Sequence, residues 1–367
     1  MEAALYHPEH GYYRRARDPF GRAGDFYTAE QIQPVFGRLM AGLVRSLWRE
    51  LGEPADFTVV ELGAGRGEMA EAFSGFRYVP VEWGRAELPE RITGLVFANE
   101  FFDALPVHVV QWRRGRFHQM LVGFDGARFV WVDGSKVPAE VAGYLRRYAG
   151  PREEGMILEV NLDALAWIDT IAEHLERGYL LAIDYGCTAA ELVRFPRGTL
   201  MTYRRHQASP DALADPGGRD ITAHVNFSAL EDHARRRGFA PIRLERLART
   251  LMAIGQPDEF ASVLAADGEK EAIALRLQLK TLVFGMGETF RTLLAGRGAS
   301  GGQKKAPIPR GRFDRTLLRP IGRRGTTSFS SQEPSSSPAP LQLSLSRSSS
   351  SDSPLGSNLR SRSEIAS

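Results

Sequence analysis

Thr58-Val-Val-Glu-Leu-Gly-Ala-Gly-Arg-Gly-Glu-Met69 is the stretch that decides the fold. The apolar run from Phe57 to Val60 predicts a buried strand, which leads into Glu61 and then into glycines at alternate positions, Gly63, Gly65 and Gly67. Glycine lets a backbone turn tightly and approach a ligand closely, and the N–H groups of a helix beginning near Glu68 would point at that ligand. The stretch therefore predicts a ligand-binding turn of the nucleotide type at the end of a first parallel strand.

The spacing of the glycines excludes two other nucleotide loops. A dinucleotide fingerprint, G-x-G-x-x-G, would need a third glycine where Glu68 stands, and a P-loop would need a Lys-Ser/Thr pair that does not follow. The remaining pattern, an acidic residue followed by x-G-x-G-x-G, resembles motif I of the class I S-adenosylmethionine (SAM) methyltransferases. The alternative is a glycine-rich turn that binds no ligand.

The composition is that of a globular chain with a different C-terminal end. Of the 367 residues 43% are apolar, Cys187 is the single cysteine, and no apolar run reaches the ~18 residues of a membrane span. Residues 298–367 carry eleven Lys/Arg against four Asp/Glu, which leaves 36 against 40 and a net charge of −4 for the rest. We therefore expect a reducing compartment, no membrane span and no nucleic-acid partner.

The N-terminus does not resemble a targeting signal, and the C-terminal end does not resemble a folded segment. Glu2, Glu9 and Asp18 interrupt the N-terminus, so we expect a cytoplasmic protein, or one of the mitochondrial matrix if the source is eukaryotic, although no transit peptide is visible. From about Gly298, serine, proline, arginine and glycine dominate. Such a segment cannot bury enough apolar surface to offset the entropy of ordering, so residues 298–367 are predicted to be a disordered tail.

Residues 1–55 are predicted to form an N-terminal helical cap. Tyr6–Tyr13 and Gly24–Thr28 are aromatic, polar and rich in glycine, which favours loops that close over a site. Residues 29–51 carry apolar side chains at helical spacing, and Thr28 is placed to cap that helix. His7 and His10 have no further Cys or His cluster nearby, so we predict no metal site.

The core, residues 56–297, alternates predicted strands and helices around an antiparallel insertion at about 107–150. Turns at Arg-Arg-Gly and at Asp125-Gly126 separate the strands of the insertion, which are Val107–Trp112, Phe117–Phe124 and Ala127–Val132. The other predicted strands are Phe76–Glu82, Gly94–Asn99, Met156–Val160 and Tyr179–Asp184. The predicted helices are Leu162–Arg177, Phe227–Arg237 and two more within residues 256–296.

Acid-bearing strand ends mark the candidate site, because ligands of an open α/β sheet bind outside the carboxyl ends of the strands. Beyond Glu61, these ends are Asn99-Glu100 and Asp184-Tyr185. Glu100 and Asp103 lie where a class I enzyme presents groups to its substrate, and carboxylates there suit a cationic acceptor such as a guanidinium. The alternatives are that Asp103 caps the next helix, that Glu100 is solvated, and that Asp184 supports a neighbouring loop.

A wider set of motifs resembles one family, the mitochondrial complex I assembly methyltransferases and their bacterial relatives. The matching stretches fall within residues 1–297 and occur in order: Tyr6-x-Pro8-x-x-Gly11-Tyr12-Tyr13, Gly24-Asp25-Phe26-x-Thr28, Phe36-Gly37, Glu61-Leu-Gly-x-Gly-Arg-Gly67, Asn99-Glu-Phe-Phe-Asp-Ala-Leu-Pro106, Asp184-Tyr-Gly186 and Met286-Gly287. The resemblance implies a class I (Rossmann-like) α/β fold, S-adenosyl-L-methionine as cofactor and methyl transfer to a protein side chain. In the mitochondrial members that side chain is an arginine of a respiratory complex I subunit.

Each candidate site residue is assigned a role on this basis. The residues expected to bind the cofactor are Glu61, Gly63, Gly65, Gly67 and Asn99, with the glycines at the methionine end of SAM, and Glu82 at its ribose. Glu100 and Asp103 are the candidate catalytic residues and would face the acceptor. The residues assigned to the substrate side are Asp25, Thr28, Asp184 and Tyr185.

The core is too short for a complete class I sheet. A helix and a strand with their loops need about 30 residues, but only the eleven from Trp83 to Thr93 separate Glu82 from the next strand. Either Phe76–Glu82 is the second strand and the next βα unit is missing, or it is the third and the second is missing. The spacing from Glu61 favours the first, whereas Trp83 and Leu88-Pro89 match the family's third strand and favour the second.

Two other classes of protein compete with an enzyme of this kind. A non-catalytic assembly or binding protein could keep the fold with a degenerate SAM site, since the shortened core leaves fewer residues than usual to contact the adenosine of SAM. A nucleotide-dependent oxidoreductase is the second rival, and Glu68 in place of a glycine argues against it.

Overall fold

The computed structural model describes residues 1–15, 34–84, 87–134 and 136–298. Asp25 and Thr28, the rest of the Gly24–Thr28 loop and the predicted tail beyond Gly298 lie outside the described residues. Within the described ranges, no helix is both long enough and apolar enough to cross a membrane.

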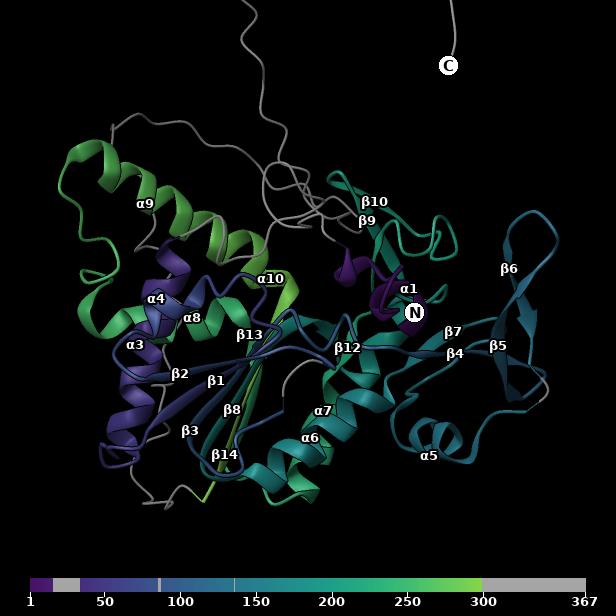
Figure 1. The fold of residues 1–367 in the computed structure, drawn as a ribbon, viewed down its shortest axis with the longest axis horizontal. Helices are drawn as coiled ribbons and strands as arrows, with labels where there is room; N and C mark the ends of the chain where they lie inside the picture. The colour runs from purple at the N-terminus through teal and green to yellow at the C-terminus, as the bar shows by residue number, and fades with distance from the viewer. Residues whose placement is uncertain (16–33, 85–86, 135, 299–367) are drawn as a thin grey trace, which may run out of the picture. The chain divides into compact units, whose positions relative to one another are not determined.

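A seven-stranded sheet forms the centre of the fold (Figure 1). Its order is β13-β14-β8-β3-β1-β2, with β12 paired to β8. The strands β8, β3, β1 and β2 run parallel, while β14 pairs antiparallel with both β8 and β13. The bounds are β1 Thr58–Leu62, β2 Arg77–Val81, β3 Ile92–Asn99, β8 Leu175–Cys187, β12 Val225–Asn226, β13 Ile242–Arg246 and β14 Phe290–Arg297. The carboxyl ends of the parallel strands therefore share one edge, and the predicted strand-end residues Glu61, Asn99 and Asp184 lie there.

Helices cover both faces of this sheet (Figure 1). On one face lie α3 (Pro34–Glu50), α8 (Leu247–Gly255) and α9 (Glu269–Thr281), and on the other lie α6 (Leu162–His174) and α7 (Phe227–Arg236). The described part of the predicted helix at 29–51 is confirmed as α3, because its apolar positions recur at helical spacing and all become buried: Val35, Phe36, Leu39, Leu43, Val44 and Leu47.

The predicted antiparallel insertion forms a separate sheet of four strands in the order β6-β5-β4-β7. Its strands are β4 (His108–Arg113), β5 (Arg116–Phe124), β6 (Phe129–Asp133) and β7 (Ile157–Val160), and α5 (Ala139–Tyr148) packs against it. The strand predicted at Met156–Val160 exists as β7, but it pairs antiparallel with β4 rather than joining the main sheet. Its alternating burial, in contrast to the fully buried β1, reflects a sheet that has only one well-covered face.

A third, small sheet was not predicted from the sequence. It contains β9 (Met201–Arg204), β10 (Gln207–Ser209) and β11 (Asp220–Thr222), in the order β10-β9-β11. The N-terminal helix α1 (Glu2–Tyr6) and the 3-10 turn η1 (Tyr12–Arg14) pack against it through Leu5, Tyr12 and Ile221. The first residues of the chain are thereby held next to a segment more than 200 positions away.

Three predicted helices differ from the observed elements. The helix expected near Glu68 is only α4 (Met69–Ala72), and the helix expected to reach Arg177 ends at His174, because Leu175 already begins β8. Of the two helices expected within 256–296, α9 is confirmed. It continues through the π-turn η4 (Leu282–Met286) and the short α10 (Gly287–Thr289), but Phe290–Arg297 is the strand β14. This segment is buried along almost its whole length between β8 and β13, and its tertiary position outweighs its local helix propensity.

Candidate functional site

The glycine turn after β1 has the backbone conformation that only glycine adopts readily. Gly63, Gly65 and Gly67 have φ values of 68°, 57° and 73°, in the left-handed region. The N–H of Gly63 donates to the carbonyl oxygen of Val81 at 2.8 Å, and a Cβ at Gly63 would lie 2.9 Å from the ring of Phe101. The turn is therefore held against β2 on one side and against the chain leaving β3 on the other.

The strand β2 pairs in parallel directly with β1, from Thr58 opposite Arg77 to Leu62 opposite Val81. It is the last strand at this end of the described sheet, so one βα unit is missing, as both alternatives for the shortened core require. The carboxylate of Glu82 accepts a hydrogen bond from the N–H of Gly65 at 2.7 Å, which places an acid beside the glycine turn.

Glu61 lies at the end of β1, almost completely buried beneath the glycine turn. Its carboxylate accepts a hydrogen bond from the hydroxyl of Tyr78, a residue of the neighbouring strand β2. Burial, and after it the charge of Glu61, raises the pKa of Tyr78. The bond thus joins the two strands on which the turn rests.

Asn99 and Glu100 follow at the end of β3. The side-chain amide of Asn99 donates to Glu100 Oε1 at 3.3 Å, and the N–H of Glu100 donates to the carbonyl oxygen of Ile183 at 2.9 Å. Glu100 has a φ of 51°, which is uncommon for a residue with a side chain. Backbone strain of this kind is concentrated at functional sites, and here it falls on a carboxylate at the end of β3, next to β8.

Asp184 holds the backbone of the segment that follows Glu100. Its side chain is 0% exposed. One oxygen accepts the N–H groups of Phe102 and Asp103 at 2.9 and 3.2 Å, and the other accepts the N–H of Tyr185 at 2.8 Å. Burial, and after it the nearby charges of Asp103 and Glu100, raises the pKa of Asp184 well above its usual range. These contacts are those of a residue that positions the loop.

Asp103 is a buried carboxyl, 3% exposed, and its pKa is raised to about 8. Burial is the larger cause and the nearby charge of Asp220 is the second. Asp220, on β11, is equally buried and accepts a hydrogen bond from the hydroxyl of Tyr13 at 2.8 Å. The structure thus brings four carboxyl groups to one place: Glu100, Asp103, Asp184 and Asp220.

Tyrosines surround this acidic cluster. The ring of Tyr185 packs on Phe290 with centroids 4.0 Å apart, and burial, followed by the charge of Glu100, raises the pKa of Tyr185. Burial, followed by the charge of Asp103, raises the pKa of Tyr203 to about 12. These phenols therefore stay protonated at neutral pH and can only act as hydrogen-bond donors or acceptors.

The N-terminal segment lies against this site, as its composition predicted. The hydroxyl of Tyr6 donates to the carbonyl oxygen of Ala104 at 3.0 Å, and its ring lies 4.1 Å from that of Trp83. Tyr13 reaches Asp220, as described above. No local sequence pattern marks Asp220 or Tyr203 as a site residue, because only the pairing of β9 with β11 brings them to the site. In the described ranges no three His, Cys, Asp or Glu side chains are arranged to hold a metal ion.

Exchanging Asp103 for asparagine should change how stability depends on pH. The folded state keeps a proton on Asp103 up to about pH 8, whereas the unfolded chain releases it near 3.8. The stability that this carboxyl contributes is therefore complete below about pH 4 and is lost as the pH rises to about 8. An asparagine side chain cannot titrate, so between pH 5 and 8 the wild type should lose roughly 2–4 kcal/mol more unfolding free energy than Asp103→Asn.

Denaturant unfolding at pH 5 and at pH 8 measures this difference. Asp56→Asn, at an exposed position before β1, is the matched control and should follow the wild type. Parallel pH profiles for the wild type and Asp103→Asn would show that the proton on Asp103 is not held in the folded state.

Comparison with known proteins agrees with this geometry. Residues 76–243 match a family described as "Putative S-adenosyl-L-methionine-dependent methyltransferase". A crystal structure of a candidate methyl transferase from Burkholderia thailandensis, bound to S-adenosyl-homocysteine, is 30% identical. It superposes with a TM-score of 0.72 over 82% of this chain and 87% of that one.

The fold and the site define a class I methyltransferase, with an α/β core, a shortened sheet and an antiparallel insertion. The chain belongs to this family of S-adenosyl-L-methionine-dependent methyltransferases, and its cofactor is S-adenosyl-L-methionine. The residues present fit that molecule, because the left-handed glycine turn leaves room for close backbone approach and carboxylates suit a sulfonium cation.

Curated relatives carry a more specific name. The protein arginine methyltransferase NDUFAF7 homolog of Drosophila melanogaster, mitochondrial, is 30% identical, with 65% of this chain and 66% of that protein covered. Protein arginine methyltransferase NDUFAF7, mitochondrial, of Homo sapiens is 28% identical, with 64% of each covered. The chain thus spans slightly less than two thirds of the length of these curated relatives.

Proposed function

We propose that this chain transfers the methyl group of S-adenosyl-L-methionine to a nitrogen of an arginine side chain in a protein. The observation that carries the proposal is the acidic cluster at the carboxyl ends of β3 and β8, with Glu100 and Asp103 in one loop. A guanidinium is a planar cation whose N–H groups bind carboxylates in a forked geometry, so such a cluster selects it. The names of the Drosophila and human relatives support the same acceptor.

The cofactor site is assigned to the glycine turn and the acids beside it. Gly63, Gly65 and Gly67 would let the methionine end approach the backbone closely, since none of them carries a side chain in the turn. Glu82 would accept the ribose hydroxyls, and Glu61 and Asn99 complete the site at the ends of their strands. Bound SAM supplies a methyl group that its sulfonium activates.

The acceptor side requires orientation and a place for one proton. Glu100 and Asp103 would hold the guanidinium so that one nitrogen lies in line with the methyl group, while Asp184 fixes the loop that carries them. A bond forms between that nitrogen and the methyl carbon as the carbon–sulfur bond breaks, and the nitrogen loses a proton to a neighbouring carboxylate oxygen. A cationic acceptor also lowers the pKa of Asp103, so the carboxyl ionises as the substrate binds.

The parts of the chain divide this work between them. Residues 1–55 would form the cap over the acceptor, with Asp25 and Thr28 on the substrate side, and residues 56–297 the methyltransferase core. The partner would be a protein substrate, and by the resemblance of the motifs a subunit of respiratory complex I. The two relatives named above are mitochondrial, and the single buried Cys187 fits a reducing compartment, whether cytoplasm or matrix.

A labelled-methyl assay on the full chain tests the proposal. Incubated with SAM and a peptide library whose central residue is arginine, the protein should produce methylarginine, detected by mass spectrometry. The same library with lysine in the centre should stay unmodified, because an ammonium cannot form the forked contact. Methylation of lysine would overturn the acceptor, and SAM binding without any transfer would favour the non-catalytic binding protein.

A further inference from the structure

The hairpin of β5 and β6 exposes more apolar surface than any other part of the described chain. It carries six of the ten large apolar side chains that the described residues leave exposed: Leu121, Val122, Phe124, Phe129, Trp131 and Val132. Phe124 is 63% exposed, and its ring is tilted against that of Phe129, with ring centroids 5.6 Å apart. These six side chains expose on the order of 600 Å² together, divided between the two faces of the hairpin.

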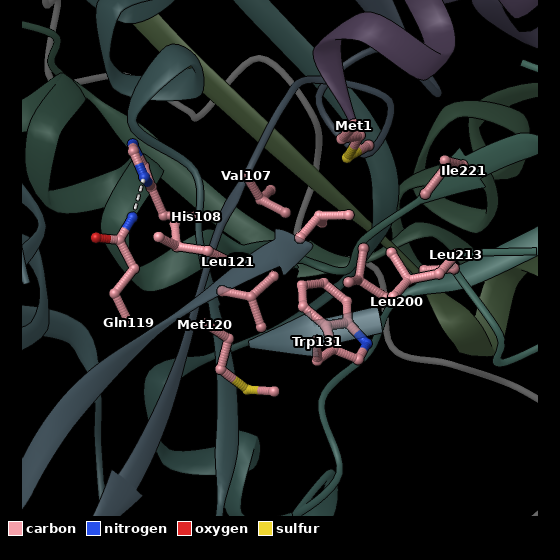
Figure 2. A pocket seen from close by; sticks show the side chains of 13 residues that line it. Met1, Val107, His108, Gln119, Met120, Leu121, Trp131, Leu200, Leu213 and Ile221 are labelled. Carbon is pink, nitrogen blue, oxygen red and sulfur yellow. Dashed lines mark hydrogen bonds between the residues drawn. The ribbon is translucent and has the colours of Figure 1, made fainter. Parts of the chain in front are cut away.

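The apolar side chains lie on both faces of the hairpin. Val122 pairs with Trp131 and points to one face, whereas Leu121 pairs with Val132 and points to the other. On the first face, Met120 and Trp131 help to line a cavity of about 190 Å³ together with Leu200, Leu213 and Ile221 (Figure 2). The segment that contains Leu200, Leu213 and Ile221 does not cover the tip of the hairpin. The helix α5 packs on the base of the second face and does not cover the tip either.

Among the described strands, β6 is also an open edge of its sheet. In the order β6-β5-β4-β7, its one partner in this part of the chain is β5. The N–H of Gly134 donates to Gln119 at 2.7 Å, and the N–H of Asp125 donates to Arg128 at 3.1 Å. Hydrogen-bonded pairs alternate along an antiparallel ladder, so the even-numbered residues of β6 bond to β5. The N–H and C=O groups of Phe129, Trp131 and Asp133 therefore point to the open edge.

The sequence of β6 does not protect this edge. Soluble proteins block edge strands with lysine, proline or a bulge, but Phe129-Val-Trp-Val-Asp133 contains neither residue and pairs with β5 without a register shift. Its centre, Val130-Trp131-Val132, reads the same in both directions. A two-fold axis at Trp131 would therefore place valine opposite valine, a favourable cross-strand pair of β-branched side chains.

We propose that two copies of this chain pair through β6, antiparallel and centred on Trp131, to form one continuous sheet of eight strands. Trp131 bonds to Trp131 of the second copy through both backbone groups, and Phe129 bonds to Asp133 of the second copy. The valines meet on one face and the aromatic rings on the other. The proposal concerns association of the chain and does not depend on which acceptor it methylates.

The exposure of both faces favours a second copy over a partner that docks on one face. A partner lying on the Trp131 face would leave Leu121 and Val132 in water, whereas edge pairing brings the side chains of β6 on both faces next to their counterparts. The exposed apolar area is less than the about 800 Å² that each partner buries in a standard interface. The dimer should therefore be reversible and depend on the chain concentration.

Light scattering coupled to size-exclusion chromatography tests this on the full chain. The wild-type mass should rise from monomer to dimer as the concentration increases through the micromolar range. Trp131→Asp puts a charge at the two-fold axis and should raise the dimer dissociation constant at least tenfold. Leu277→Asp is the matched control, since Leu277 is an apolar residue 59% exposed on α9, and it should dimerise like the wild type. A wild type that stays monomeric, or a Trp131→Asp variant that dimerises normally, would overturn the proposal.

Cysteine cross-linking tests the register independently of how Trp131→Asp folds. Residues in a hydrogen-bonded antiparallel pair have Cα atoms about 5.5 Å apart, within reach of a disulfide. Trp131→Cys should therefore form a covalent dimer on mild oxidation, because the only other cysteine, Cys187, is buried. Phe129→Cys, whose Cα would lie about 13 Å from its own copy, should stay monomeric on a denaturing gel. Equal cross-linking of both variants would overturn the pairing, and cross-linking of neither would do the same.

Discussion

Gly65→Val should abolish measurable binding of S-adenosyl-L-methionine while leaving the chain folded. Gly65 has a φ of 57°, which a β-branched side chain cannot adopt without strain, and its N–H donates to the carboxylate of Glu82. A valine would both move the turn and fill the space where the cofactor approaches the backbone. We expect a loss of affinity of more than about 100-fold, or about 2.7 kcal/mol, in a calorimetric titration.

The strain itself needs a control, and Gly52 provides one. It has a φ of 79° in the turn after α3, and a Cβ there would meet no atom within 4 Å. Gly52→Val should lower the free energy of unfolding through the same backbone strain as Gly65→Val, but it should leave SAM affinity unchanged. If Gly65→Val bound SAM as tightly as Gly52→Val does, the glycine turn would not be the cofactor site.

The second large effect is expected from Glu100→Gln, which should lower turnover by about 100- to 10,000-fold, the range typical of a lost proton-transfer group. Glutamine keeps the shape of Glu100 and can still accept the amide hydrogen bond of Asn99. The substitution removes the negative charge that would hold the guanidinium. It also removes the carboxylate that would accept the proton leaving the acceptor nitrogen. SAM affinity should therefore stay within a factor of about 3, so the loss appears in kcat and not in cofactor binding.

Glu90→Gln, at an exposed position before β3, is the matched control and should leave both quantities unchanged. Two results would contradict the role of Glu100. An equal loss of SAM affinity would place it in the cofactor site, and unchanged turnover would move the acceptor elsewhere. Single-turnover rates measured with saturating SAM separate the two outcomes.

The glycine turn and its strands could be predicted from the sequence because their signals are local. In the run Phe57–Val60 every residue but Thr58 is apolar, and a strand buried on both faces is expected to be largely apolar. Three alternate glycines after an acid restrict the turn to few conformations, and all three adopt the left-handed φ. The predictions for the hairpins of the insertion succeeded for the same reason, since turn residues at Asp125-Gly126 mark the end of a strand.

What could not be predicted depends on contacts between distant segments. Asp220 joins the acidic cluster because β11 pairs with β9 and because Tyr13 reaches across from the N-terminus. The place of Phe76–Glu82 in the sheet followed from neither spacing nor motif, since both alternatives had local support. In the structure it pairs in parallel with β1, at the edge of the described sheet.

The segment Phe290–Arg297 shows the same limit. Its residues form helices as readily as strands, and the prediction placed two helices within residues 256–296. In the structure it fills the gap between β8 and β13, where its buried apolar side chains contact both faces of the core. Burial of this kind outweighs the small differences in local propensity.

A calorimetric titration of S-adenosyl-L-methionine into the full wild-type chain tests most directly whether a sheet that ends at β2 still forms a cofactor site. The glycine turn is intact, Glu82 lies 2.7 Å from the N–H of Gly65, and the Burkholderia thailandensis structure that this chain resembles was crystallised with S-adenosyl-homocysteine. We predict one SAM bound per chain with a dissociation constant in the micromolar range. No heat of binding and no rise in melting temperature up to about 1 mM SAM would contradict this, since a ligand that binds only the folded state must stabilise it.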